Sequence, residues 1–387
     1  MKQFSIAKTL PVFMAFYVMG FGDIVGLASD YAQRDFGLSS TLAQMLTLMA
    51  FVWFFLLSVP VGIFQDKHSK RLTVIISFLF FMASFIAPFL SKNFYGMLAS
   101  FTLLGIGNAI VQVSANPLMQ DVSPPDKLSR NLTLSQFVKA IAGMLGPVIA
   151  AFCASKFDNW MLIYWVYLFI CILSLLWLQL TPIQETGNTG RASFSSTLKL
   201  LSDRKVALLV MGTFVMVGFD VGMNTNIARY LKASFGVSQE EAIVGISIYF
   251  AALMAGRFLG ALILNKFSGN KMLLYCAILS VASFVLLYLM PDFKTGRIAI
   301  FCIGLFTATI FPLIFSAGLQ YMPDRANELS GLMIMSVCGG GVIPPIVGVL
   351  TDLSNLMTAL VLLGVCLVYV VFLALYIIKT EKSSSKQ

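Results

Sequence analysis

Hydrophobic and polar residues follow each other along this chain in long blocks. Runs of roughly 20 predominantly apolar residues, the length at which a helix crosses the hydrocarbon core of a bilayer, are separated by short segments rich in Lys, Arg, Asp and Gly. This pattern predicts twelve transmembrane helices. The predicted spans are residues 9–31, 41–65, 72–90, 94–120, 131–155 and 160–181, and then 206–231, 241–265, 272–290, 296–321, 329–351 and 355–378.

The longest polar stretch, which contains QETGNTGRASFSS, lies in the middle of the chain. It divides the sequence into an N-terminal six-helix bundle (1–182), a cytoplasmic linker (183–205) and a C-terminal six-helix bundle (206–387). The two halves echo each other, because MGFGDIVGLASDYAQRDFGLS near the start resembles VGFDVGMNTNIARYLKASFGVS after the linker. Such duplication is typical of transporter folds. The predicted fold class is therefore an all-α membrane protein with two pseudo-symmetric bundles.

Composition supports this class and sets the orientation. Only 11% of the residues are charged and the mean hydropathy is +0.88, whereas soluble domains carry about 25% charged residues. The net charge of +9 does not indicate a nucleic-acid partner, because Lys and Arg lie mostly in short loops. Of 26 such residues, 17 fall on the side that holds both termini and seven on the other. The positive-inside rule then predicts a multi-pass membrane protein with both termini in the cytoplasm.

Several chemistries are not supported by any motif in the sequence. The six Cys lie inside apolar runs without CxxC spacing, so we expect neither a disulfide framework nor a metal site. No HExxH, GxSxG or Walker loop is present, and we therefore expect no enzymatic activity and no cofactor. Without an ATP-binding motif, the energy for transport must come from a gradient.

Two carboxylates inside predicted spans are candidate proton-coupling groups. Asp23 and Asp220 occupy comparable places in the first and seventh spans. An ionisable group at a helix centre costs roughly 2.5–3.5 kcal/mol on insertion scales, so it should face a polar region or a partner. Burial favours the protonated form of a carboxyl group, which suits a group that takes up a proton on one side and releases it on the other. A structural ion pair is the alternative for each.

Other polar residues within spans are candidate substrate-binding residues. Amides four residues apart make a stripe on the fourth span, and amides donate and accept hydrogen bonds as sugar hydroxyls require. Lys139 lies on one face of the fifth span with an amide, and it pairs with Asp23, binds an anionic substrate or stands in for a coupling cation. Trp53 and Tyr249 are candidates for stacking or plain packing. The predicted substrate-binding residues are Gln112, Asn116, Gln136, Lys139, Asn224 and Arg257.

A polar turn, GIFQDKHSKR, follows the second span. Its charged residues Asp66 and Arg71 are predicted to form a gating loop that holds the inner ends of the second and third spans, charge to charge and charge to helix end.

Several of these stretches resemble the fucose:proton symporter family, a branch of the major facilitator superfamily that includes glucose and galactose carriers. They are VGFDVGMNTNIARY, AGRFLGALILNKF, GLFTATIFPLIFSAG and GGGVIPPIVGVLTD in the second half, and GIGNAIVQVSANPL and RNLTLSQF in the first. Two positions depart from the family. Gln112 stands where the fucose carriers have Glu, and Lys139 where they have Asn, so the family's proton handling does not transfer directly.

The resemblance implies a secondary active transporter that carries a hexose or deoxyhexose with a proton (or sodium) by alternating access. The expected partners are a sugar, the coupling ion and the lipid bilayer, with the chain acting as a monomer. An exporter or exchanger of another polar or anionic solute is a second interpretation. A membrane sensor without transport activity is a third, from a different functional class.

Overall fold

The computed structural model describes residues 6–38, 40–186, 190 and 192–384, and the regular secondary structure of this part of the chain is helical. The α-helices of the first half are α1 (Ile6–Met19), α2 (Val25–Asp35), α3 (Ser40–Lys67), α4 (Lys70–Leu90), α5 (Phe94–Val122), α6 (Leu128–Phe157) and α7 (Ile163–Leu180). Then come α8 (Phe194–Lys199), α9 (Arg204–Phe235), α10 (Gln239–Ile263), α11 (Gly269–Leu289), α12 (Phe293–Thr307), α13 (Ile310–Tyr321), α14 (Ala326–Met335), α15 (Gly339–Leu353) and α16 (Leu356–Ser384). Short 3-10 segments occur at η1 (Gly20–Ile24), η2 (Pro125–Lys127), η3 (Trp160–Leu162), η4 (Leu200–Ser202), η5 (Pro323–Arg325) and η6 (Ser336–Cys338).

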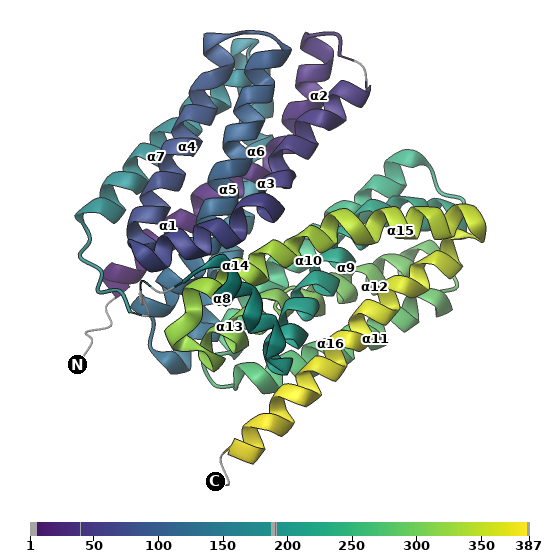
Figure 1. Cartoon of the computed structure of the whole chain (residues 1–387). Coiled ribbons are helices and arrows are strands. Elements are labelled where there is room, and N and C mark those ends of the chain that lie inside the picture. The colour runs from purple at the N-terminus through teal and green to yellow at the C-terminus, as the bar shows by residue number, and fades with distance from the viewer. Residues whose placement is uncertain (1–5, 39, 187–189, 191, 385–387) are drawn as a thin grey trace. The chain divides into compact units, whose positions relative to one another are not determined.

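The membrane-spanning segments agree with the predicted fold class. Within the described residues, 11 helices are long and apolar enough to cross a membrane, and the count is 12 if the bent pair Ile6–Ile24 and Leu27–Asp35 is one span. The bend between these two helices is 41° and is visible where α1 turns into α2 (Figure 1). The chain is thus a multi-pass membrane protein.

Three of the predicted spans are interrupted in the structure. The first changes to a 3-10 helix at η1, the tenth breaks between α12 and α13, and the eleventh breaks at η6. The first and third of these breaks lie next to glycines, which destabilise a helix because their backbone loses more conformational freedom than that of other residues. The break in the tenth span precedes Pro312 in the first turn of α13, where the proline ring and its missing N–H oppose helix continuation.

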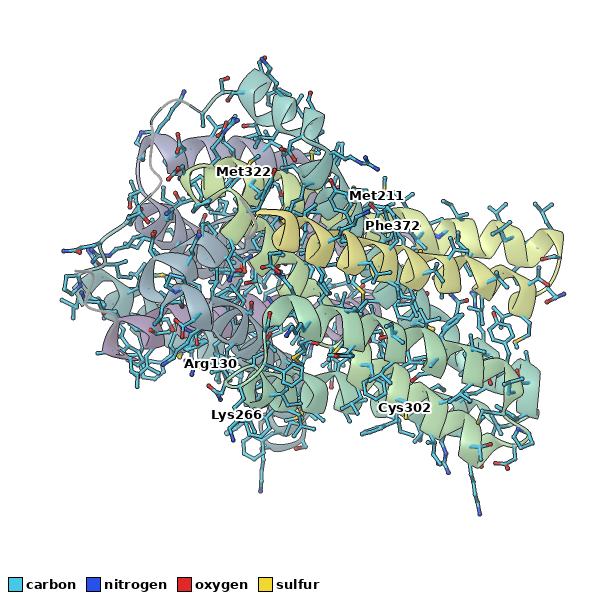
Figure 2. The ribbon with its side chains drawn as sticks, turned by 90° about the horizontal axis from the view of Figure 1, so that it is seen from below. Arg130, Met211, Lys266, Cys302, Met322 and Phe372 are labelled. Atoms are coloured by element: carbon cyan, nitrogen blue, oxygen red, sulfur yellow. The ribbon has the colours of Figure 1, made fainter. Side chains whose placement is uncertain are left out.

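The chain folds into two compact units. Unit 1 contains residues 1–128, 135–199 and 322–335, and unit 2 contains residues 129–134, 200–321 and 336–387. Unit 1 therefore includes α14, which packs against α3 and α5. In unit 2, α9 packs against α10, α15 and α16. Apolar side chains remain exposed on both units, as lipid contact requires. Figure 2 shows two of them in unit 2, Met211 on α9 and Phe372 on α16, each 47% exposed.

The contact of α14 with α5 repairs a gap that a proline leaves. Pro117 lies inside α5 and has no N–H to donate to Val113, four residues earlier. Ser330 of α14 donates its Oγ hydrogen to that carbonyl oxygen at 2.6 Å. The helix α5 consequently continues through its proline to Val122.

Candidate functional site

The first candidate carboxylate lies in unit 1 on the 3-10 segment η1. Asp23 Oδ1 is 3.5 Å from Lys139 Nζ of α6, and the two side chains are 44% and 21% exposed. This is an ion pair in which neither group is buried. Of the alternatives open for Lys139, the structure brings it beside Asp23.

Glycines allow η1 and α6 to approach closely. A Cβ atom on Gly20 would lie 2.4 Å from the carbonyl oxygen of Lys139, and one on Gly143 would lie 2.9 Å from Asp23 Oδ2. Because neither glycine carries a side chain, the backbones can meet and the short Asp23 side chain reaches the lysine. The sequence analysis did not assign these two glycines.

The polar stripe of α5 lies in the same unit. Gln112 and Asn116 are buried, and Asn116 Nδ2 donates to the main-chain oxygen of Gln112 at 2.7 Å. Asn108, one turn earlier, places its Nδ2 beside Gly22 of η1. Its buried Oδ1 has no hydrogen-bond partner among the described residues. Gln136 of α6 is also buried. Unit 1 thus places the Asp23–Lys139 pair in the same bundle as several buried amides.

The second candidate carboxylate lies in unit 2, in the middle of the unbroken helix α9. Asp220 Oδ1 accepts a hydrogen bond of 2.6 Å from the Oη of Tyr249 on α10. Tyr249 is fully buried, and the charge of Arg257, on the same helix, also acts on its hydroxyl. Asn224 is half-buried one turn after Asp220. The structure therefore joins Asp220 to the hydroxyl of Tyr249, a residue that the sequence suggested for stacking or packing.

A closed polar cluster forms at the end of unit 1 that adjoins the linker. Lys70 Nζ and Asp121 Oδ2 are 2.6 Å apart, and both side chains are only 1% exposed. Lys70 also donates to the carbonyl of Thr186, whose own N–H and hydroxyl donate to Asp121. Glu185 accepts hydrogen bonds from the first N–H groups of α4, at Lys70 and Arg71, where the helix dipole favours negative charge. The start of the linker is thereby attached to α4 and α5.

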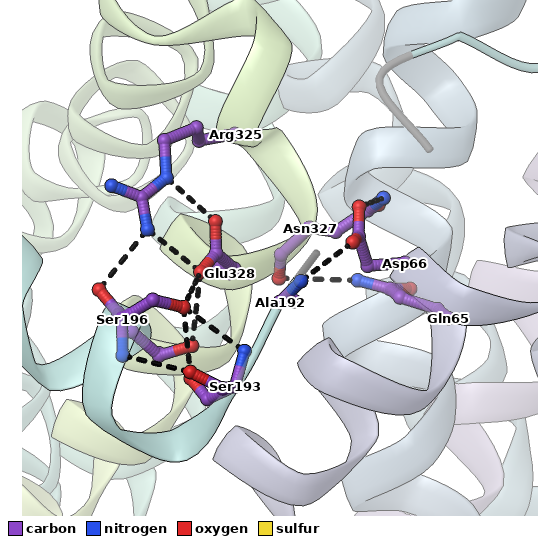
Figure 3. A network of polar contacts seen from close by, with 9 residues as sticks. Gln65, Asp66, Ala192, Ser193, Ser196, Arg325, Asn327 and Glu328 are labelled. Carbon is purple, nitrogen blue, oxygen red and sulfur yellow. Dashed lines mark hydrogen bonds and ion pairs between the residues drawn. The ribbon is translucent and has the colours of Figure 1, made fainter. Parts of the chain in front are cut away.

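A second network joins the linker to α14 (Figure 3). Asp66 accepts hydrogen bonds from the N–H of Ala192 at 3.1 Å and from Asn327 Nδ2 at 3.2 Å. Glu328 binds Arg325 at 2.6 Å and accepts a hydrogen bond from Ser196 of α8 at 2.7 Å. All of these residues belong to unit 1.

The two residues predicted as a gating loop have different partners and lie in helices. Asp66 is in the last turn of α3 and contacts α14, whereas Arg71 is in the first turn of α4. Arg71 donates from Nε to the carbonyl of Leu178 at 3.1 Å, and also to Gln179, at the end of α7. We expected a charge of this turn to interact with an end of the second or third span. Arg71 does interact with a helix end, but that end belongs to α7 of the sixth span.

Sequence reasoning missed Asp121, Glu185 and Glu328 and the polar role of Tyr249. The three acids lie near the ends of predicted spans, where a charge is ordinarily solvated and carries no signal of its own. For Tyr249, the hydroxyl on a buried face opposite Asp220 was visible only after the helices had packed.

Comparison with known proteins places the chain among transporters. Residues 11–345 match the Major Facilitator Superfamily. The chain is 27% identical to a putative glucose/galactose transporter of Helicobacter pylori strain J99, with 95% of this chain and 96% of the relative covered. It is 23% identical to the L-fucose-proton symporter of Escherichia coli strain K12, with 86% and 84% covered.

Solved structures agree in fold. The transporter FucP in its outward conformation superposes with a TM-score of 0.86 at 19% identity, covering 97% of this chain and 99% of FucP. The human organic anion transporter MFSD10 superposes with a TM-score of 0.75 at 13% identity, covering 95% and 98%. With the family match over most of its length, this chain belongs to the Major Facilitator Superfamily.

Proposed function

We propose that the chain is a secondary active transporter, not an enzyme, that carries a hexose or deoxyhexose together with a proton by alternating access. The observation that carries this proposal is end-to-end similarity to proteins named as glucose/galactose transporters, which covers 95–97% of this chain. The L-fucose-proton symporter of Escherichia coli is a further relative over 86% of the chain.

The polar groups inside the spans suit such a substrate. The amides of Gln112, Asn116, Gln136 and Asn224 both donate and accept hydrogen bonds, as neighbouring sugar hydroxyls do. Arg257 supplies donors, and the carboxylate of Asp220 supplies an acceptor. Each unit carries at least one acid and one base within its spans, so each offers an uncharged ligand both hydrogen-bond acceptors and donors.

The coupling group is one of two carboxylates, Asp23 and Asp220. We favour Asp220, because the hydrogen bond it accepts comes from the neutral phenol of Tyr249, whereas Asp23 has the ammonium of Lys139 beside it. A carboxylate whose nearest partner is uncharged can gain and lose a proton without breaking an ion pair.

The chain acts as a monomer in the bacterial inner membrane with both termini in the cytoplasm. The excess of Lys and Arg on the side of the termini supports this orientation. Protease or thiol-reagent access to a tag at either end of the chain, in sealed inside-out vesicles against right-side-out vesicles, tests it. Access in the right-side-out vesicles would reverse the orientation.

A second function has one observation in its favour. Lys139 and Arg257 are cations within spans, and a human organic anion transporter shares the fold. An anionic solute held by one of these cations is therefore the alternative to a sugar.

One screen separates the two functions. The purified protein is heated with glucose, galactose, fucose or glucuronate, because a ligand that binds only the folded state raises the melting temperature. Stabilisation by a neutral sugar, followed by its accumulation in proteoliposomes under an imposed proton gradient, is the expected result. Stabilisation by glucuronate alone would replace the sugar with an anionic substrate.

A further inference from the structure

Unit 1 contains two Lys–Asp pairs that differ in how completely they are satisfied. Lys70 and Asp121 are 2.6 Å apart and almost fully buried. Each also has hydrogen bonds to Thr186. These features describe a structural pair, in which every partner is supplied by the protein.

The pair of Asp23 and Lys139 is open by the same criteria. Its atoms are 3.5 Å apart, longer than the roughly 2.7–2.9 Å of a charge-assisted hydrogen bond, and its side chains are 44% and 21% exposed. The close contacts of Gly20 and Gly143 between η1 and α6 nevertheless hold the two charges opposite each other. The backbone thus keeps the ammonium near the carboxylate without closing the pair.

The remaining described groups that face Asp23 are neutral. Asn108 of α5 lies beside Gly22, the preceding residue. Tyr167 of α7 lies alongside, with its ring stacked on Phe21 of η1 at a centroid distance of 3.8 Å. Among the ion pairs found in the described part of the chain, the one cation within 4 Å of Asp23 is Lys139.

We propose that Lys139 is a resident counter-ion, which supplies the positive charge opposite Asp23 that a coupling ion would otherwise have to supply. Unit 1 then passes through the transport cycle with a neutral carboxylate–ammonium pair and binds no coupling proton. Coupling is left to Asp220 in unit 2. This inference rests on the proposed function for its role in transport, but the charge compensation itself is independent of the substrate.

On this proposal, the protein tolerates the loss of both charges, Asp23 and Lys139, better than the loss of Lys139 alone. With Lys139→Met, Asp23 is left as an uncompensated charge within a membrane span, which is unfavourable until a proton neutralises it. The double variant Asp23→Asn/Lys139→Met has no charge to compensate. The matched control is Lys92→Met, which removes an exposed lysine between α4 and α5.

The first experiment needs no substrate. Melting temperatures of the four proteins (wild type and the three variants) are measured at about pH 7.5 and about pH 5.5, because a carboxyl group within a membrane span that has lost its counter-charge favours its protonated form at the lower pH. Only Lys139→Met should be destabilised at the higher pH and recover at the lower one, relative to wild type and Lys92→Met. The double variant should lose this pH response. A response that persists in the double variant, or its absence in Lys139→Met, would overturn the counter-ion proposal.

The second experiment measures transport with glucose, galactose and fucose as probes. Uptake by Lys139→Met should fall about tenfold at the higher pH, recover at the lower pH, and recover at both when Asp23→Asn is added. If Lys139→Met does not fold, folding of the double variant supports compensation and failure of both contradicts it. If no probe sugar is transported by wild type while the melting response is present, the sugar function fails and the counter-ion stands.

Discussion

The first span of each half carries a carboxylate at a comparable place, but the two halves treat it differently. In unit 1, Asp23 lies in a 3-10 segment, is partly exposed and faces the charged group of Lys139. In unit 2, Asp220 lies within the continuous helix α9 and accepts a hydrogen bond from the neutral Tyr249. One half neutralises its acid with a base, whereas the other holds it with a hydroxyl.

The backbone difference follows from what the nearby glycines meet. Gly20 faces the main-chain carbonyl of Lys139, so its helix approaches another backbone. Gly222 of α9 instead faces a side chain, that of Leu363, and a Cβ atom on Gly218 would meet the Ile343 side chain at 2.3 Å before the Gly339 carbonyl oxygen at 3.1 Å. A repeated Gly and Asp pattern therefore predicts where a polar group lies along the span, but its environment depends on the helix that packs against it.

Corresponding prolines in the fourth and tenth spans show the same divergence. The sequence ANPL around Pro117 and IFPL around Pro312 occupy similar positions in the two halves. The helix α5 is continuous through Pro117, with Ser330 bonded to the carbonyl that the proline leaves free. The chain instead breaks between α12 and α13 just before Pro312. A local proline signal thus produces a break only where the surroundings do not compensate for it.

The largest expected effect separates the two carboxylates. Asp220→Asn should abolish accumulation of sugar against a gradient but retain exchange of sugar across the membrane, because it removes the proposed proton carrier and keeps a polar side chain. Asp23→Asn should retain some accumulation, since its pair has no coupling role in our proposal. Proteoliposome uptake and counterflow assays distinguish the two. Full accumulation by Asp220→Asn would eliminate it as the coupling group.

The next effect concerns the neutral partner of Asp220. Tyr249→Phe removes a hydrogen bond to a charged group, a contribution of about 1.5–3 kcal/mol, and should reduce proton-driven uptake about tenfold or more. The ring remains, so packing is largely preserved. Unchanged uptake at several proton gradients would show that Tyr249 serves only to fill space.

A third prediction tests the glycine contrast. Gly20→Ala places a Cβ against the Lys139 carbonyl oxygen and should cost about 1–3 kcal/mol in stability, with reduced transport as η1 moves away from α6. Gly222→Ala meets the end of the flexible Leu363 side chain and should cost less. Melting temperatures and uptake of both variants are the measurement. Equal losses would mean that the close approach in unit 1 has no special importance.

A fourth prediction tests the proline contrast. Ser330→Ala leaves the carbonyl of Val113 without its hydrogen bond, and a buried unsatisfied group costs about 1–3 kcal/mol. We expect a lower melting temperature with Ser330→Ala than with Ser336→Ala, a buried serine beyond the contact with Val113. Combining Ser330→Ala with Pro117→Ala should remove most of the loss, because the helix regains its own N–H donor.

The smallest expected effect is on stability in acid, and it distinguishes two helix N-cap residues. Asp292 caps α12 by accepting from Thr295 N–H, and that backbone hydrogen bond lowers the pKa of its carboxyl group. Asn93 caps α5 in the same way but has no charge to lose. Because the pKa of Asp292 is lower in the folded protein than in the unfolded chain, the ionised carboxylate stabilises the fold at pH values above the unfolded-state pKa. This stabilisation is lost as the pH falls through the folded-state pKa and the carboxylate is protonated. The free energy of unfolding of Asp292→Asn should therefore fall slightly less than that of wild type as the pH is lowered, whereas that of Asn93→Asp should fall slightly more.

Much of the architecture could be predicted because each span must satisfy its own backbone hydrogen bonds in lipid. That requirement produces long apolar runs, and these located the spans and their approximate bounds. The candidate site was less predictable. Spacing placed Asp23 and Lys139 on separate helices, and left open whether they meet. Nothing in the sequence connected Tyr249 with Asp220, or Asp121 with Lys70.

The sequence alone determined the membrane class, the doubled plan and the few polar residues within spans, because hydropathy and helical periodicity are local properties. Only the tertiary structure decided which of those residues share a hydrogen bond or an ion pair, and whether a glycine or proline interrupts its helix. The physical reason is that each outcome depends on a second helix: the Lys139 carbonyl against Gly20, the Tyr249 hydroxyl on Asp220, and Ser330 on the carbonyl freed by Pro117.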